Sequence, residues 1–71
     1  MFEIKQEVAE RIKSKYKLSS IAKEVGISNS YLTLIFKNER PCSKKLAYCI
    51  TKYIDENAEI EDFFDKVKGE E

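Results

Sequence analysis

Apolar residues recur along this chain at helical spacing, and short polar segments separate the stretches in which they recur. In the segment from Phe2 to Tyr16, the apolar residues Ile4, Val8 and Ile12 follow one another every four positions, with Glu and Lys between them. Because residues four apart lie on the same face of an α-helix, this spacing predicts an amphipathic first helix with one buried stripe.

A second, short helix is predicted next. Ser19 or Ser20 offers a side-chain oxygen to the free backbone N–H groups at its start. Gly26 marks its end, because glycine adopts left-handed backbone angles at little cost. The side chains predicted to face inward from this helix are Ile21, Ala22 and Val25.

Ser28 is the predicted N-cap of a third helix, which runs from Asn29 to about Lys37. Its apolar residues fall on one side, and they are Leu32, Ile35 and Phe36. Helical geometry turns Leu34 away from this stripe, so the sequence predicts an exposed leucine on the other side of the helix.

Pro41 interrupts the helical pattern between residues 38 and 42, because proline lacks a backbone N–H and restricts the residue before it. Ser43 then caps a predicted fourth helix with a broad apolar face. The residues of that face are Leu46, Ala47, Cys49, Ile50, Tyr53 and Ile54. A fifth, short helix is predicted from the spacing i, i+3, i+4, i+7. Its apolar residues are Ile60, Phe63, Phe64 and Val67.

These elements predict one all-α domain over residues 1–71, with residues 68–71 frayed. A chain of 71 residues supports one modest core and leaves little room for a deep substrate cavity. No apolar run reaches the roughly 20 residues of a membrane-spanning helix, and no signal-peptide core follows Met1, so a cytoplasmic protein is expected.

Chemistry by the chain itself is not expected. The sequence has no histidine, no glycine-rich phosphate loop and no Cys-x-x-Cys pair, so no catalysis, cofactor, metal site or disulfide is predicted. Cys49 lies at a core spacing of its helix, whereas Cys42 falls in a loop where exposure to solvent is possible.

The formal net charge of zero conceals an uneven distribution. Residues 1–54 carry 11 Lys and Arg against 5 Glu, a balance of +6, and residues 55–71 carry 2 Lys against 8 Asp and Glu, a balance of −6. A basic body favours nucleic-acid binding. The acidic end is explained equally well by a solvated helix surface or by an interaction with a basic partner.

The most informative stretch is Ile21-Ala22-x-x-Val25-Gly26-Ile27-Ser28-x-x-x-Leu32-x-x-Ile35. Two short helices that cross steeply leave room only for a small side chain at their closest approach, which Ala22 supplies, and Gly26 allows the chain to reverse. The second helix of such a unit protrudes, so its polar face can enter a groove about 12 Å wide.

In these positions the sequence resembles the Cro and phage-repressor (XRE-type) helix-turn-helix family over nearly the whole chain. The matching segments are Ile21-Ala22, Gly26-Ile27-Ser28, Leu32-x-x-Ile35-Phe36, Asn38-Glu39-Arg40-Pro41-Cys42-Ser43, Leu46-x-x-Cys49-Ile50 and Glu59-Ile60-Glu61-Asp62-Phe63-Phe64. The resemblance implies a five-helix lambda-repressor-like fold with the motif in its second and third helices. It also implies a sequence-specific DNA-binding transcriptional regulator, a repressor by preference.

The chain departs from this family at two positions. Leu18 stands where many relatives have a glutamine that contacts phosphate, and Asn38 stands where the family's loop has a glycine. Asparagine tolerates positive φ better than other non-glycine residues, so Asn38 can preserve the turn. The contacts to the DNA backbone are therefore expected to differ from those of the family.

Two sets of DNA-contacting residues are predicted. A carboxamide can pair with adenine, and a hydroxyl can donate or accept at any base. The predicted base-reading residues are Asn29, Ser30, Thr33 and Leu34. The predicted phosphate contacts are Ser19, Ser20, Lys37, Asn38, Arg40, Lys44 and Lys45.

A homodimer on a pseudo-palindromic operator is expected, with half-sites about one helical turn apart. Phe64 and Val67 are the candidate dimer contacts, and Phe63 is expected in the core of the monomer. A protein-binding modulator of a mobile element, similar to an antirepressor, is the alternative. Leu18, Leu34 and the acidic end favour this second hypothesis.

Overall fold

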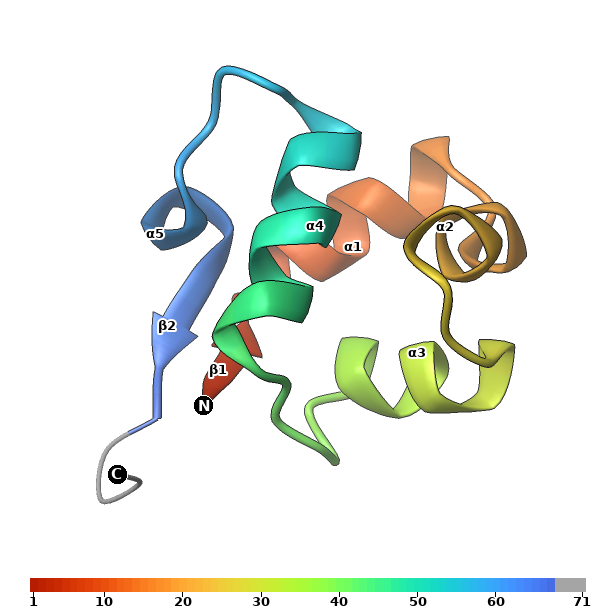
Figure 1. Cartoon of the computed structure of the whole chain (residues 1–71), viewed down its shortest axis with the longest axis horizontal. Coiled ribbons are helices and arrows are strands. Elements are labelled where there is room, and N and C mark those ends of the chain that lie inside the picture. The colour runs from red at the N-terminus through yellow and green to blue at the C-terminus, as the bar shows by residue number, and fades with distance from the viewer. Residues whose placement is uncertain (68–71) are drawn as a thin grey trace.

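The computed structural model describes residues 1–67, and the predicted fraying of residues 68–71 lies outside the described residues. Within residues 1–67 the chain is mostly helical and has a small two-stranded sheet (Figure 1). In chain order the elements are β1 (Phe2–Ile4), α1 (Gln6–Lys15), α2 (Leu18–Val25), α3 (Asn29–Phe36), α4 (Lys44–Ile54), α5 (Ile60–Phe63) and β2 (Phe64–Lys66). No helix in this described range is long and apolar enough to cross a membrane.

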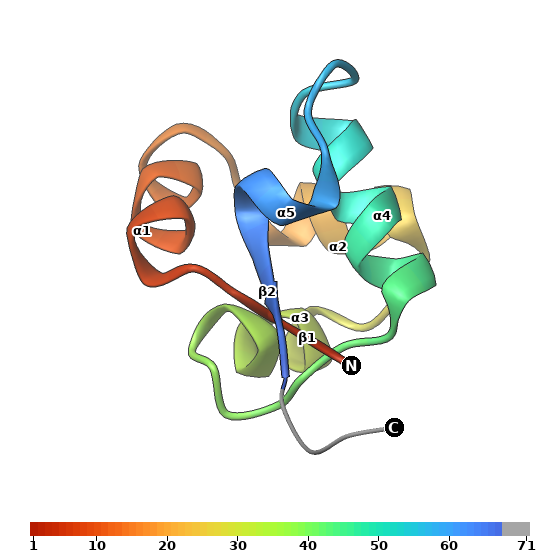
Figure 2. The same cartoon turned by 90° about the vertical axis from the view of Figure 1, so that its left-hand side faces the viewer.

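The sheet joins the start of the chain to the end of the described range (Figure 2). β1 and β2 run antiparallel, with Phe2 opposite Lys66 and Ile4 opposite Phe64. The predicted five helices are present in residues 1–67, but the all-α prediction did not include this sheet: the first helix starts only after β1, and the fifth stops before β2 rather than at Val67. Short apolar segments fit a strand as well as a helix, and the pairing partner lies too far along the chain for local periodicity to reveal it.

The start of α2 also differs from the prediction. Its N-cap is Lys17, which makes no side-chain capping hydrogen bond, so the predicted capping role of Ser19 or Ser20 is wrong. Both serines are exposed in the first turn, because the half-buried Leu18 packs against the core as the first residue of the helix. Gly26 ends α2 as predicted, with φ of 80° in the left-handed region.

Serine caps start α3 and α4, as the sequence predicts. The Ser28 Oγ accepts a hydrogen bond from the Tyr31 N–H at 3.0 Å, and the Ser43 Oγ accepts one from the Leu46 N–H at 3.2 Å. Each bond satisfies a backbone donor that the first turn of a helix leaves unpaired, and such a cap stabilises a helix by about 1 kcal/mol. The starting residue of each helix is thereby fixed.

Asn38 follows the end of α3 and itself adopts the left-handed conformation, with φ of 61°. The Asn38 N–H donates to the Ile35 carbonyl and the Glu39 N–H donates to the Leu34 carbonyl, both at 3.0 Å. This pair of bonds is the Schellman arrangement, which reverses the chain at a helix end. The predicted role of Asn38 in the turn is therefore confirmed.

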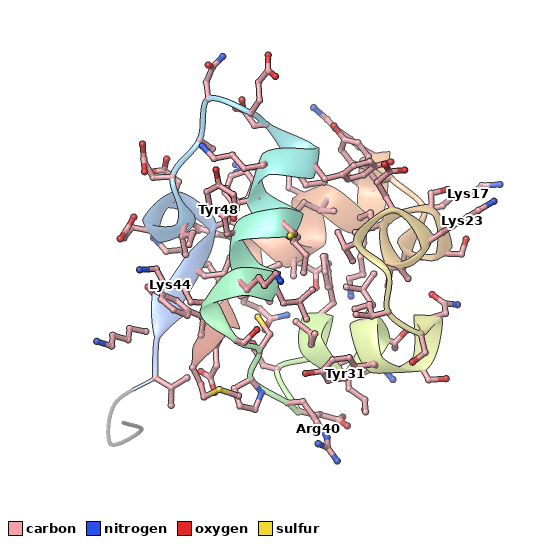
Figure 3. All side chains as sticks on the ribbon, viewed as in Figure 1. Lys17, Lys23, Tyr31, Arg40, Lys44 and Tyr48 are labelled. Carbon is pink, nitrogen blue, oxygen red and sulfur yellow. The ribbon has the colours of Figure 1, made fainter. Side chains whose placement is uncertain are left out.

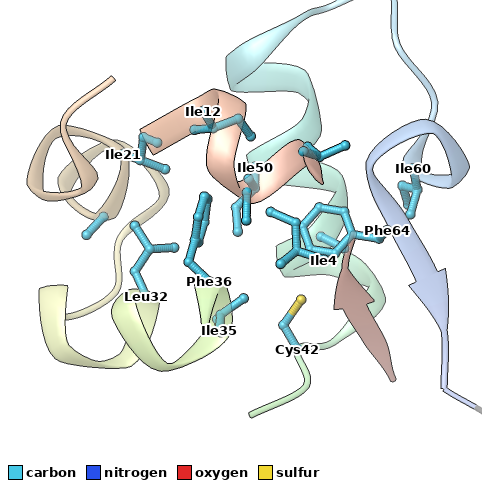
Figure 4. Close-up of a cluster of buried hydrophobic side chains, with 14 residues drawn as sticks. Ile4, Ile12, Ile21, Leu32, Ile35, Phe36, Cys42, Ile50, Ile60 and Phe64 are labelled. Carbon is cyan, nitrogen blue, oxygen red and sulfur yellow. The ribbon is translucent and has the colours of Figure 1, made fainter. Parts of the chain in front are cut away.

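One cluster of buried apolar side chains lies between the helices and the sheet (Figure 4). Its members are Ile4, Val8, Ala9, Ile12, Ile21, Ala22, Leu32, Ile35, Phe36, Cys42, Ala47, Ile50, Ile60 and Phe64. Phe36 and Phe64 are the largest fully buried side chains in the described range. Burial of a side chain of this size stabilises the fold by about 1.5–3 kcal/mol relative to an exposed position.

The C-terminal aromatic residues belong to this core. Phe64 is only 1% exposed, so its assignment as a dimer contact is wrong: β2 turns the side chain into the monomer. Phe63 is partly buried and packs against the cluster, which confirms its predicted place in the monomer core. Val67 is half-buried and its N–H donates to the Met1 carbonyl at 2.9 Å, and its role as a dimer contact stays a prediction.

Cys42 is fully buried, so the expected exposure of its loop position is wrong. The backbones of Phe2 and Cys42 pair in both directions, with N–H to carbonyl distances of 2.7 and 2.8 Å, and this bridge holds the loop against the core. Burial raises the pKa of the Cys42 thiol from 9.0 to about 11, and the nearby positive N-terminus opposes this rise only in part. The thiol is therefore neutral at physiological pH.

The predicted apolar face of α4 is confirmed only in part. Ala47 and Ile50 are buried, but Tyr53 is 38% exposed, and its ring instead meets the Tyr16 ring edge-on at 6.3 Å. Three further residues of the face are half-buried, and they are Leu46, Cys49 and Ile54. Thr51, which was not predicted to be inside, is fully buried.

Candidate functional site

α2 and α3 form a pair of short consecutive helices connected by residues 26–28, and α4 also packs against α2. The left-handed Gly26 reverses the chain after α2, and the Ser28 cap starts α3 two residues later. Because a glycine and a serine fix the two ends of this connection locally, the sequence alone determines which faces of α3 turn inward and outward.

The inward face of α3 is apolar and completely buried. Its residues are Leu32, Ile35 and Phe36, as predicted. On the other side, Asn29, Ser30 and Lys37 are exposed, and Thr33 is half-buried. The predicted base-reading residues Asn29, Ser30 and Thr33 are therefore brought together on the outward side of one helix.

Thr33 and Leu34 are less available than the sequence suggested. The Thr33 Oγ1 donates to the Asn29 carbonyl at 2.9 Å, so its proton is used within the helix and its lone pairs remain as acceptors. Leu34 is half-buried rather than fully exposed, because the chain reversal at Asn38 brings Glu39 back beside it. Leu34 therefore contributes only part of its apolar surface to this face.

Asn38 connects the end of α3 to the start of α1. Its Nδ2 donates to the Gln6 Oε1 at 3.1 Å, and its Oδ1 is buried without a hydrogen-bond partner in the part of the chain that the structure describes. The side-chain donor that was predicted to contact phosphate is thus engaged within the molecule. Asn38 acts here as a brace that fixes the end of α3 against α1.

The predicted cationic contacts come from the α3–α4 loop and from the start of α4. Lys37 follows α3, Arg40 lies in the loop, and Lys44 and Lys45 begin α4; all four are exposed. Figure 3 draws Arg40 below the end of α3, whereas Lys44 lies on the side of α4 toward β2. The structure therefore brings Arg40, but not Lys44, to the α3 side of the molecule.

A surface hollow that the sequence did not reveal lies between the α2–α3 connection and the start of α4. It has a volume of about 280 Å³. The residues around it are Val25, Ile27, Tyr31, Ser43, Lys45, Leu46 and Cys49. Its apolar members come from separate elements and are all only partly buried, and no local pattern in the sequence indicates that they converge.

In the described part of the chain, no group of three His, Cys, Asp or Glu side chains is arranged to hold a metal ion. The chain was also compared with protein-family models, with curated proteins and with solved structures, and none of the three comparisons found a match. The function must therefore be inferred from the residues and their geometry.

Proposed function

We propose that this domain is a sequence-specific DNA-binding transcriptional regulator, and a repressor, that inserts α3 into the major groove. The observation that carries the proposal is the division of α3 into a fully buried apolar face and an outward face with Asn29 and Ser30. In this proposal α2, the Gly26 turn and α3 act as a helix-turn-helix of the Cro and phage-repressor type, which the sequence resembles.

The dimensions of α3 suit this role. An α-helix of about 10–12 Å diameter fits the major groove of B-DNA, which is about 12 Å wide. α3 has eight residues, enough to present two turns to the base edges. Its first turn is the part that meets the bases in such a docking geometry, and Asn29 and Ser30 are exposed there.

Each group in the site has a distinct proposed role. Asn29 pairs with adenine through its carboxamide, and Ser30 donates to or accepts from a base edge. Thr33 accepts a hydrogen bond, and the exposed part of Leu34 contacts a thymine methyl group. The phosphate contacts come from residues of α2, the α3–α4 loop and α4. These are Ser19, Ser20, Lys37, Arg40 and Lys45.

A homodimer is proposed for binding to two half-sites about one helical turn apart. Phe64 takes no part in its interface, because the side chain is buried in the monomer. The half-buried Val67 remains a candidate for the two-fold contact.

Titration of fluorescently labelled DNA from the chain's own promoter region tests the proposal, with a permuted duplex of the same composition as the control. Asn29→Ala should weaken binding to the promoter duplex about 10- to 100-fold, since one bidentate base contact contributes about 1–3 kcal/mol. Asn57→Ala, an exposed asparagine beyond α4, is the matched control and should leave affinity unchanged.

Salt separates phosphate contacts from base contacts. Arg40→Gln should lower the slope of log affinity against log salt by about one unit, because each phosphate contact releases a counterion. Lys13→Gln removes the same charge from α1 and should leave the slope unchanged. An affinity that ignores both sequence and salt would refute the DNA-binding proposal.

The hollow beside Tyr31 favours a second candidate function, in which the domain binds a protein. Five partly buried apolar residues surround it, and a partner could cover them: Val25, Ile27, Tyr31, Leu46 and Cys49. A stoichiometric protein that co-purifies with the chain and is lost in a Leu46→Asp variant, together with no DNA retardation at low salt, would favour this function over the first.

A further inference from the structure

A second surface hollow lies between α1, the end of α4 and α5, and it shares no residue with the proposed DNA contacts. It has a volume of about 230 Å³. The residues around it are Val8, Arg11, Ile12, Lys15, Tyr16, Ile54, Asp55 and Phe63. These side chains are apolar at the base and charged at the edge, which is the composition of a site for an amphipathic molecule.

The base of this hollow belongs to the core. Val8 and Ile12 are almost completely buried, and Ile54 and Phe63 are partly buried and pack against the same cluster. Tyr16 is 37% exposed, and its ring contacts the Tyr53 ring edge-on at 6.3 Å, which holds it in place beside the opening. An apolar ligand body would therefore meet a fixed aliphatic and aromatic surface.

The edge of the hollow is net positive. Arg11 and Lys15 are one turn apart on α1, so they lie on the same face of the helix, and both are exposed. Asp55 supplies the opposite charge, but its Oδ1 accepts the Asn57 N–H at 3.0 Å, which fixes this carboxylate at the end of α4. Two cations against one anion favour a negatively charged occupant.

We infer that this hollow binds a small organic anion, an aromatic carboxylate whose ring lies on the apolar base. Arg11 binds the carboxylate through its paired N–H donors, and Lys15 adds a second charged contact. The volume lies below the roughly 300–1,000 Å³ of sites for drug-sized ligands, so the ligand is limited to about one or two rings. A neutral ring would make the same apolar contacts but would form no ion pair with Arg11 or Lys15.

The test is a titration of the full ¹⁵N-labelled chain with 1-naphthoate and, separately, with its neutral isostere 1-naphthamide. Binding is measured from the backbone amide chemical shifts, and no DNA is present. Naphthoate should give saturable shifts at residues around the hollow, with a dissociation constant of roughly millimolar or tighter. Naphthamide should bind about tenfold more weakly. Failure of DNA binding would leave this result intact, because the two experiments share neither ligand nor residues.

Charge variants locate the contact. Arg11→Gln should weaken naphthoate about tenfold and naphthamide hardly at all, since only the anion uses the guanidinium. Lys13→Gln is the matched control, because Lys13 is exposed on the same helix but does not line the hollow. The inference would be overturned by equal affinity for the two ligands or by chemical shifts that do not saturate. It would also be overturned if Lys13→Gln weakened naphthoate binding as much as Arg11→Gln does. Retained amide dispersion in both variants verifies that they are folded.

Discussion

Replacing Thr51 with valine should stabilise this domain. The Thr51 side chain is fully buried in α4, and its Oγ1 has no hydrogen-bond partner among residues 1–67. A buried hydroxyl without a partner costs about 1–3 kcal/mol relative to its hydration in the unfolded chain. Valine has nearly the same shape and helix propensity and carries no polar atom, so Thr51→Val removes this cost without opening a cavity.

The expected gain is about 1 kcal/mol, the lower end of that range, because threonine in a helix can rotate toward a carbonyl of the preceding turn. For a domain of this size, 1 kcal/mol raises Tm by roughly 4–8 °C. Thermal unfolding followed by circular dichroism measures this shift. Urea unfolding should show a higher midpoint with an unchanged m value, as expected when only stability changes.

Thr33→Val is the matched control for this substitution. The Thr33 Oγ1 donates to the Asn29 carbonyl at 2.9 Å on a half-exposed face, so its removal should change stability by no more than about 0.5 kcal/mol. A Thr51→Val variant that is less stable than the parent chain would refute the reasoning, because it would show that the buried hydroxyl has a partner in solution.

Three further predictions concern the sheet, the thiols and the end of α3. Phe64→Ala should lower the free energy of unfolding, measured in urea, by about 3–5 kcal/mol. The control Tyr48→Ala, at a side chain that is 52% exposed, should lower it by less than about 1 kcal/mol. Equal losses of stability in the two variants would contradict the burial of Phe64. In a thiol assay with an aromatic disulfide at pH 8, half-buried Cys49 should react readily. Cys42 should react at least about 100-fold more slowly until urea unfolds the chain, because burial raises its pKa to about 11. Equal reaction rates of the two thiols in the native protein would contradict this assignment. Asn38→Ala should lower stability by about 1–2 kcal/mol and Asn38→Gly by less, because only glycine and asparagine accept φ of 61° readily. If thermal unfolding shows the glycine variant to be the less stable of the two, the explanation of this turn by the left-handed Asn38 is refuted.

Features that depend on neighbouring residues could be predicted from the sequence. The serine caps of α3 and α4, the left-handed Gly26 and the turn at Asn38 each involve residues within one helical turn of one another. The buried and exposed faces of α3 follow from its start, because helical periodicity then assigns every side chain a direction. The polar face of the candidate site was therefore predictable.

Features that depend on distant residues could not be predicted in this way. The strand Phe2–Ile4 exists because its partner lies at residues 64–66, and Cys42 is buried because it pairs with Phe2. The sequence predicts Asn38 as a phosphate contact, whereas in the structure its side chain donates a hydrogen bond to Gln6. The two surface hollows also escaped prediction, since each is assembled from helices that are separate in the sequence.

The strand β1 bonds to β2 on one side and to Cys42 on the other, so it connects the beginning, middle and end of the described chain. Contacts between such distant segments must close very long loops, whereas the α2–α3 unit forms from residues close together in sequence. We therefore expect the helices to assemble early in folding and the sheet to lock last. Variants in the sheet should then accelerate unfolding while leaving the folding rate nearly unchanged. The pairing of β1 would thereby determine the unfolding rate, and with it the lifetime of the native state.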